Sequence, residues 1–366
     1  METLPFFFKK SREDFLALGG WELENHRAVK KLITLVMHGQ MGSKEISEIQ
    51  FFSRPSMLSP MKLFLILLAL IPVLQAQNKK HLNPFLWDNP LAPRFSRTGV
   101  LHRTYESQIN TATVGFNILL PPGYETEKDR RYPAVYLLHG GRPGSENKLL
   151  NMTPFIQEAI KSKVIPPTIY VFVNGGPVSH YDYPTPIKHL GPGFGTKGNS
   201  TFVKELIPHI DSTYRTIAAR KGRFLEGYSQ GGRGTLRTAF RNPELFAAAS
   251  AGSAGVATEL KIQENKGKEN DAVRFAIGDD AYSLAKDYAA EKMEAHPLHL
   301  QLYTGDSKKD FNWGGNLAYS KYLTSLGIKH THLLIPNCGH STKQAYEISG
   351  RKLFQFFAPH LRAASK

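Results

Sequence analysis

The sequence predicts an α/β fold built on a mostly parallel central sheet with helices on both faces. Apolar runs of strand length alternate with segments of helical spacing along most of the chain, an order typical of parallel sheets covered by helices. The runs at 132–138 and 168–173 are apolar throughout, as expected of central strands that are buried on both faces. Because there is no internal repeat and no second core, one folded domain is expected from residue 99 to residue 366.

The expected elements follow in chain order. Strands or short apolar runs are predicted at 113–120, 132–138, 168–173, 223–225, 245–251, 298–303 and 331–335. Helices are predicted at 153–163, 202–214, 235–240, 317–326 and 342–357, and Pro208 is expected to kink the second of them. The residues between 252 and 295 have no clear pattern.

The composition is that of an ordinary folded protein with a strong positive charge. The net charge is +15, but the basic residues are scattered and mixed with acids, with no arm or stripe suited to nucleic acid. We therefore predict solvated charged faces and no nucleic-acid partner. The single cysteine, Cys338, excludes an intrachain disulfide, and no His, Cys or Asp cluster has metal-ligand spacing, so neither a metal nor a cofactor is expected.

The N-terminal part is predicted to carry a targeting signal. Residues 61–76 contain a lysine, a run of twelve apolar residues and a small residue, Ala76, for cleavage, which is the layout of a secretory signal peptide. We expect a secreted or periplasmic protein without stable membrane insertion after cleavage. Residues 1–60 are expected to be an over-extended reading frame or a disordered tail, the rival being a cytoplasmic tail before a membrane anchor. Residues 77–98 are rich in Pro and Asn and are expected to be an extended lead-in.

The motif around Ser229 predicts a catalytic nucleophile. Residues 227–231 read Gly-Tyr-Ser-Gln-Gly, between a predicted strand and a predicted helix. This is the pattern of a nucleophile elbow, a turn so sharp that a side chain at either glycine would collide with the backbone. The helix that follows directs its N-terminal N–H groups at the serine hydroxyl.

A serine nucleophile needs a base and a carboxylate, which in this kind of fold follow it in the chain. Of the six later histidines, His340 alone lies in a loop directly after a predicted strand and before a helix, so we predict that it is the base. The acid should follow the preceding strand, where Asp306 and Asp310 are both available, and we prefer Asp310 because Asp306 suits a turn.

The remaining predicted site residues bind the substrate. We expect the backbone N–H groups of Gln230 and Gly141 to form the oxyanion hole, with His139 bracing the loop that contains Gly141. Tyr181, Tyr183 and Trp313 are candidates to line a pocket for an aromatic acid, the alternative being that they are ordinary packed aromatics.

These motifs together resemble the putative esterase family of α/β-hydrolases, over most of the chain from residue 104 to residue 361. The matching segments are Leu-Leu-His-Gly-Gly at 137–141, Glu-Leu-Ile-Pro-His-Ile-Asp at 205–211, Tyr-Arg-Thr at 214–216, Gly-Tyr-Ser-Gln-Gly-Gly at 227–232 and Gly-His at 339–340. The family includes feruloyl, acetylxylan and enterochelin esterases, S-formylglutathione hydrolases of the esterase D type and mycolyltransferases. Asp310 with Phe311 and Asn316 matches the family pattern better than Asp306, but two extra residues after Gly305 depart from it.

The resemblance implies an α/β-hydrolase fold and a secreted serine esterase that acts through an acyl-enzyme. Its expected substrates are feruloyl or acetyl esters of plant polysaccharides. The alternatives are a siderophore esterase, an acyltransferase and, from a different class, a non-catalytic carbohydrate-binding relative.

Overall fold

The computed structural model describes residues 85–141, 144–177, 180–182, 197–256, 278–306 and 309–366. The predicted tail, the predicted signal peptide, the first part of the lead-in and Tyr183 lie outside these residues. In the part of the chain that is described, no helix is both long enough and apolar enough to cross a bilayer.

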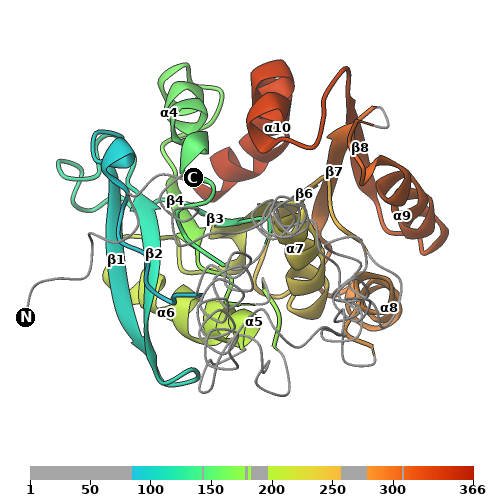
Figure 1. Cartoon of the computed structure of the whole chain (residues 1–366), viewed down its shortest axis with the longest axis horizontal. Helices are drawn as coiled ribbons and strands as arrows, with labels where there is room; N and C mark the ends of the chain where they lie inside the picture. The colour runs from blue at the N-terminus through green and yellow to red at the C-terminus, as the bar shows by residue number, and fades with distance from the viewer. Residues whose placement is uncertain (1–84, 142–143, 178–179, 183–196, 257–277, 307–308) are drawn as a thin grey trace, which may run out of the picture. The chain divides into compact units, whose positions relative to one another are not determined.

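The described residues form an eight-stranded sheet in the order β1-β2-β4-β3-β5-β6-β7-β8 (Figure 1). All neighbours from β4 to β8 are parallel, whereas β2 pairs antiparallel with both β1 and β4. The bounds are β1 Val100–Ser107, β2 Ala112–Leu119, β3 Ala134–Leu138, β4 Ile169–Val173, β5 Arg223–Tyr228, β6 Ala248–Gly252, β7 His299–Gly305 and β8 His330–Ile335. The predicted α/β class with a mostly parallel sheet is confirmed.

The burial of the strands follows their place in the sheet. Every residue of β3, β4 and β6 is buried, which explains why their sequences are apolar or small throughout. The edge strands are less buried, with three buried positions in β1 and one in β8. The polar sequence of β1, which contains His102 and Arg103, is why this strand was not predicted.

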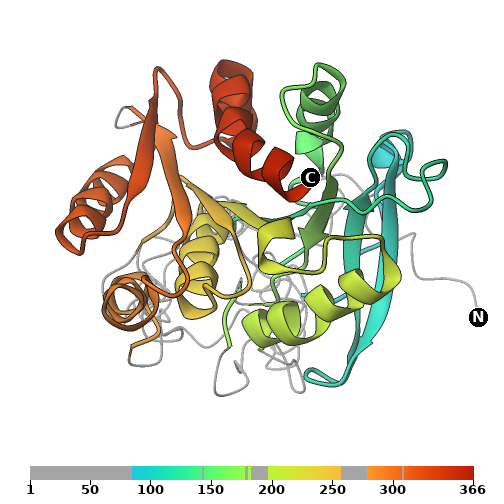
Figure 2. The ribbon, with the colours of Figure 1, turned by 180° about the vertical axis from the view of Figure 1, so that it is seen from behind.

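Helices cover both faces of the sheet (Figures 1 and 2). One face carries α4 and α10, and the other carries α5 to α9. Their bounds are α4 Thr153–Lys161, α5 Gly198–Thr201, α6 Ile207–Thr213, α7 Gln230–Arg241, α8 Ala281–Asp287, α9 Trp313–Ser325 and α10 Thr342–Ala364. On the first face, Phe357 of α10 packs edge-on against Phe224 of β5 with 5.9 Å between the ring centroids, and truncating such a buried ring to alanine costs about 3–5 kcal/mol.

Several helices differ from their predicted bounds; α7 and α9 begin earlier than predicted, and three further differences have a physical reason. Residues 202–206 form a π-helical turn between α5 and α6, so the helical hydrogen-bond pattern changes directly before Pro208, which has no N–H to donate to the preceding turn. Helix α10 runs past Pro359 to Ala364 because Leu361 and Ala364 remain buried. Helix α8 lies in the segment without a clear sequence pattern, and Asp280 caps its first turn.

The parallel register places the ends of four strands together. Tyr228 at the end of β5 is opposite Gly252 of β6, which is opposite Tyr303 of β7, and Gly305 of β7 is opposite Ile335 of β8. Chain segments that leave these strands therefore start from one edge of the sheet, the expected place for a site in this architecture.

Candidate active site

Ser229 occupies a strained turn between β5 and α7. Its backbone has φ 61° and ψ −117°, a conformation that costs free energy in any residue other than glycine. A Cβ at Gly227 would overlap the carbonyl oxygen of Gly231, and a Cβ at Gly231 would overlap the carbonyl oxygen of Leu138. The predicted steric need for both glycines is therefore confirmed.

His340 bridges Ser229 and Asp310. Its Nε2 lies 2.9 Å from Ser229 Oγ, and its Nδ1 lies 2.9 Å from Asp310 Oδ1. The histidine follows β8 and precedes α10, and the aspartate follows β7. Three residues that span 111 positions of the chain therefore meet at the carboxyl ends of the parallel strands. This is the geometry in which an imidazole accepts a proton from a hydroxyl while a carboxylate orients the ring.

The two candidate aspartates occupy different environments. Asp310 is 1% exposed and accepts from Thr304 Oγ1 and from the backbone N–H groups of Gly305 and Asn312, in addition to its contact with His340. Asp306 is exposed and accepts from the backbone N–H of Asn337. Asp310 is therefore the residue that reaches His340, and Asp306 supports the loop that leads to it.

Hydrogen bonds keep Asp310 ionised. Burial by itself would raise the pKa of Asp310, but bonds from His340, Ser253 and backbone N–H groups outweigh burial and lower the pKa to about 2. A negative charge next to Nδ1 stabilises the positive charge that His340 would gain with a proton.

Ser253 is a site residue that the sequence analysis missed. It is fully buried, its Oγ lies 2.6 Å from both carboxylate oxygens of Asp310, and it lies 2.9 Å from His340 Nδ1. It directly follows β6, at the same sheet edge as Ser229. A search for polar residues directly after every predicted parallel strand would have found it.

Two aromatic rings flank the imidazole of His340. The ring centroid of Tyr228 is 5.1 Å away, and that of Phe311 is 3.9 Å away. Phe311 is 73% exposed although it is large and apolar. An exposed ring beside the base gives the site an apolar surface that an arriving substrate can contact.

The loop after β3 lies against Ser229. A Cβ at Gly140 would come within 2.9 Å of Ser229 Cβ, and Gly141 has φ 68°. His139 braces this loop as predicted, because its Nε2 accepts from the backbone N–H groups of Gly175 at 3.0 Å and Ser145 at 3.3 Å. Gln230 is the first residue of α7, directly after the serine. Both predicted oxyanion residues are therefore in segments that adjoin Ser229.

The predicted pocket residues have mixed surroundings. Tyr181 is buried with its ring under the guanidinium of Arg237, whose carbon is 3.9 Å from the ring centroid, and these are contacts of a packed aromatic. Trp313 is half-buried at the start of α9. Tyr183 lies outside the described residues.

Comparisons with known proteins identify the family. The family model described as "Putative esterase" matches residues 107–316, which is more than half of the chain. Two curated esterases, from two strains of Mycobacterium tuberculosis, are each 27% identical to this chain over 248 residues, which cover 62% of this chain and 52% of the relative. The chain thus spans about half the length of the curated relatives it matches.

Solved structures share the fold. A ferulic acid esterase is 22% identical with a TM-score of 0.58, over 71% of this chain and 98% of that one. A ferulic acid esterase from Anaeromyces mucronatus is 18% identical with a TM-score of 0.54, over 73% and 91%. An S-formylglutathione hydrolase from Staphylococcus aureus is 18% identical with a TM-score of 0.53, over 71% and 98%.

This chain belongs to the putative esterase family and has the α/β-hydrolase fold, as the family match, the eight-stranded sheet and the glycine-flanked serine turn together indicate.

Proposed function

We propose that this protein hydrolyses carboxylic esters with Ser229 as the nucleophile. The observation that carries the proposal is the position of the His340 ring, with one nitrogen 2.9 Å from the serine hydroxyl and the other 2.9 Å from a buried carboxylate. Membership of the esterase family supports it. A serine hydroxyl is a weak nucleophile at neutral pH, and a neutral imidazole in this position removes its proton as the hydroxyl attacks.

The reaction follows from the roles of the neighbouring groups. Ser229 Oγ attacks the ester carbonyl and its proton passes to His340 Nε2, while Asp310 holds Nδ1–H and balances the new charge. The N–H groups of Gln230 and Gly141 receive the oxyanion, and each such donor contributes about 3 kcal/mol to transition-state stabilisation. His340 then protonates the departing alcohol, and water activated by the same imidazole releases the acyl group.

The substrates that we propose are feruloyl or acetyl esters of plant polysaccharides. We propose that the enzyme is exported and cleaves them outside the cell or in the periplasm. The exposed ring of Phe311 beside His340 suits an aromatic acyl group, and two of the similar solved structures are ferulic acid esterases. The predicted signal peptide at 61–76 supports export.

A panel of esters tests the function and the substrate class together. The full chain should hydrolyse p-nitrophenyl acetate and methyl ferulate, with S-formylglutathione as the thioester comparison and Ser229→Ala as the matched control. If S-formylglutathione is preferred by far, the substrate class is wrong but the serine chemistry stands. Absence of turnover on every ester would favour the non-catalytic carbohydrate-binding relative.

Export is tested separately. A reporter protein fused behind residues 61–76 should be secreted and cleaved after Ala76, and its retention in the cytoplasm would contradict the proposed localisation.

A further inference from the structure

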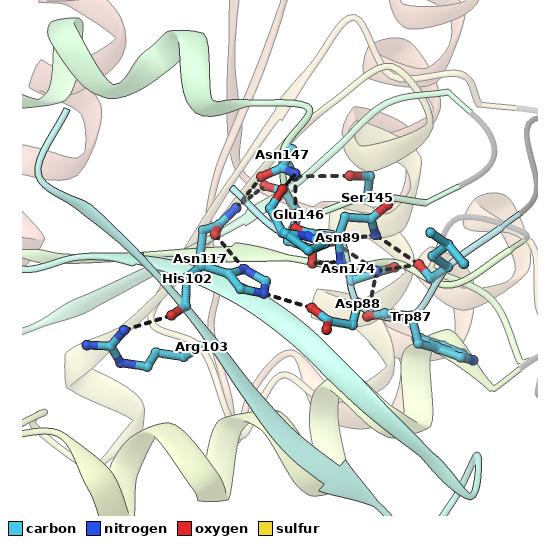
Figure 3. A network of polar contacts seen from close by, with 12 residues as sticks. Trp87, Asp88, Asn89, His102, Arg103, Asn117, Ser145, Glu146, Asn147 and Asn174 are labelled. Atoms are coloured by element: carbon cyan, nitrogen blue, oxygen red, sulfur yellow. Dashed lines mark hydrogen bonds and ion pairs between the residues drawn. The ribbon is translucent and has the colours of Figure 1, made fainter. Parts of the chain in front are cut away.

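Three side chains from distant segments converge at a second place in the fold (Figure 3). Asp88 belongs to the lead-in, His102 to β1, and Glu146 to the loop after β3 that also contains Gly140. His102 Nε2 lies 2.7 Å from Asp88 Oδ1, and one ligand atom from each of the three residues lies within 4.8 Å of the other two. No sequence spacing links these residues, which is why none of them was predicted as a ligand.

A chain of amide groups fixes the tautomer of His102. The side-chain NH₂ of Asn147 donates to two backbone carbonyls of the lead-in, so its Oδ1 is turned toward Asn117. The NH₂ of Asn117 donates to Asn147 Oδ1 at 2.8 Å and to the carbonyl oxygen of Glu146 at 3.1 Å, so its own Oδ1 faces His102 Nδ1 at 3.0 Å. An amide oxygen can only accept, and Nδ1 must therefore carry a hydrogen.

With Nδ1 protonated, a neutral His102 directs the lone pair of Nε2 at the Asp88 carboxylate. Two lone pairs that face each other at 2.7 Å repel unless a positive charge lies between or beside them. Histidines that bind metals have this arrangement, with one ring nitrogen donating to a neighbouring oxygen and the other facing the ion.

Glu146 adds a second carboxylate to the cluster, and this one is buried. It is 1% exposed, and its hydrogen bonds come from neutral groups, the backbone and side-chain N–H groups of Asn89 and the amide of Asn174. Buried carboxylates are ordinarily paired with a positive charge, which these neutral donors do not supply.

Glycine at position 115 leaves the space between the three side chains open. A Cβ there would overlap Glu146 Oε1, and it would lie 2.8 Å from Asp88 Oδ1 and 3.0 Å from His102 Cε1. All three groups therefore face the same side-chain-free point of β2.

We propose that Asp88, His102 and Glu146 bind a divalent transition-metal ion of the Zn²⁺ class, with water completing its coordination. One imidazole nitrogen and two carboxylates suit Zn²⁺ better than Ca²⁺ or Mg²⁺, which prefer oxygen ligands alone. Donors about 2.1 Å from a tetrahedral ion lie about 3.4 Å apart, so small side-chain shifts bring all three onto one ion.

The ion would have a structural role. It would join the lead-in and β1 to the loop that starts at His139 and passes Ser229 at Gly140. No step of the proposed hydrolysis uses it, so this inference stands or falls independently of the proposed function.

Titration of the full chain tests the site directly. After dialysis against EDTA, Zn²⁺ should bind at pH 7.5 with one saturable equivalent that raises the melting temperature, and Ca²⁺ at the same concentration should not compete. His102→Gln should weaken that equivalent at least tenfold, whereas the matched control His296→Gln, outside the cluster, should leave it unchanged. Co²⁺ should give a visible absorption band in the wild type that is lost in His102→Gln.

The Zn²⁺ titration of the wild type tests the proposal without any variant, so the test still holds if His102→Gln fails to fold. Absence of a saturable equivalent, or equal binding by wild type and a folded His102→Gln variant, would overturn it. The half-exposed Asp88 offers a milder variant, Asp88→Asn, which should also weaken binding. If ¹⁵N spectra show both ring nitrogens of His102 protonated in the presence of Zn²⁺, a proton occupies the cluster and the metal site is wrong.

Discussion

Among the described residues, His340 and His102 each have a carboxylate neighbour, but on opposite ring nitrogens. In His340 the carboxylate of Asp310 is at Nδ1, and Nε2 faces the hydroxyl of Ser229. In His102 the carboxylate of Asp88 is at Nε2, and Nδ1 is held by the amide oxygen of Asn117.

This difference determines what each imidazole can do. In His340 the carboxylate at Nδ1 stabilises the imidazolium, and Nε2 remains available to accept a proton from the nucleophile. In His102 both ring nitrogens face protein oxygens, the Asp88 carboxylate at Nε2 and the Asn117 amide at Nδ1, so neither nitrogen is placed to take a proton from a nucleophile, and Nε2 and the carboxylate can share a cation. The same residue pair therefore suits acid–base catalysis at one place and cation binding at the other.

The largest expected effect separates the two histidines by activity. His340→Gln removes the base and should lower kcat/KM on p-nitrophenyl acetate by about 10⁴-fold or more. His102→Gln should lower it by less than about tenfold, because His102 touches no reacting atom. Steady-state kinetics on both variants gives the comparison, and equal losses would mean that the second cluster takes part in catalysis.

The next test concerns the carboxylate of the active site. Asp310→Asn should lower turnover by about 10⁴-fold because the amide no longer fixes the tautomer of His340. It should also lower stability, since an amide NH₂ would face the N–H donors that Asp310 now accepts. The melting temperature of Asp310→Asn should therefore fall below that of the wild type.

Asp306→Asn is the matched control for Asp310→Asn. It should cost at most about 1 kcal/mol of stability and little activity.

The stability that Asp310 contributes should be present above its ordinary pKa of 3.8 and be lost as the pH falls toward 2. Acid unfolding of the wild type, Asp310→Asn and Asp306→Asn measures this loss of stability. An inactive Asp306→Asn enzyme would mean that Asp306, and not Asp310, is the acid of the site.

A buried glutamate in each region sharpens the comparison further. Glu226 lies directly before the serine turn and accepts from the hydroxyls of Tyr346 and Tyr303. Burial raises the pKa of Glu226 from 4.5 to about 7. Because the folded state holds this proton more tightly, Glu226 costs stability as the pH rises from 4.5 to 7, on the order of 3 kcal/mol in total.

Glu226→Gln imitates the protonated acid and should remove that loss. Its denaturation midpoint should exceed the wild-type midpoint at pH 8 and match it at pH 4.5. Zn²⁺ should leave the difference between Glu226→Gln and wild type unchanged, whereas it should stabilise the wild type but not Glu146→Gln. A Glu226→Gln variant that is less stable at pH 8 would show that the ionised form is favoured in the fold.

A smaller effect than that of Asp310→Asn is expected at Ser253. Ser253→Ala removes one hydrogen bond to the Asp310 carboxylate but leaves the contacts from His340 and the backbone. Turnover should fall about tenfold, consistent with the 1.5 kcal/mol or so of a bond to a charged group. A loss as large as that of Asp310→Asn would mean that Ser253 has a role of its own in proton transfer.

The sequence predicted the features that depend on local sterics. The turn at Ser229 was predictable because both glycines are required by backbone atoms within a few residues or at the end of a neighbouring strand. The positions of His340 and Asp310 followed from the rule that site residues lie after parallel strands. The choice between Asp306 and Asp310 remained open because loop spacing does not say which carboxylate turns inward.

The features that sequence reasoning missed depend on pairing between distant segments. Strand β1 has a polar sequence and is recognisable only through its register with β2. Its His102 reaches Asp88 and Glu146 only once the lead-in and the loop after β3 are folded against it. No property of three isolated residues 14 and 44 positions apart indicates a common site.

The central claim, that Ser229 attacks the substrate carbonyl, is tested most directly by trapping the acyl-enzyme. The full chain should be mixed with p-nitrophenyl acetate, quenched in acid within milliseconds, and analysed by intact-mass and peptide mass spectrometry. We predict one acetyl group per chain, located on Ser229, with no adduct in Ser229→Ala and little in His340→Gln. An acetyl group on any other residue, or the same adduct in Ser229→Ala, would contradict the account.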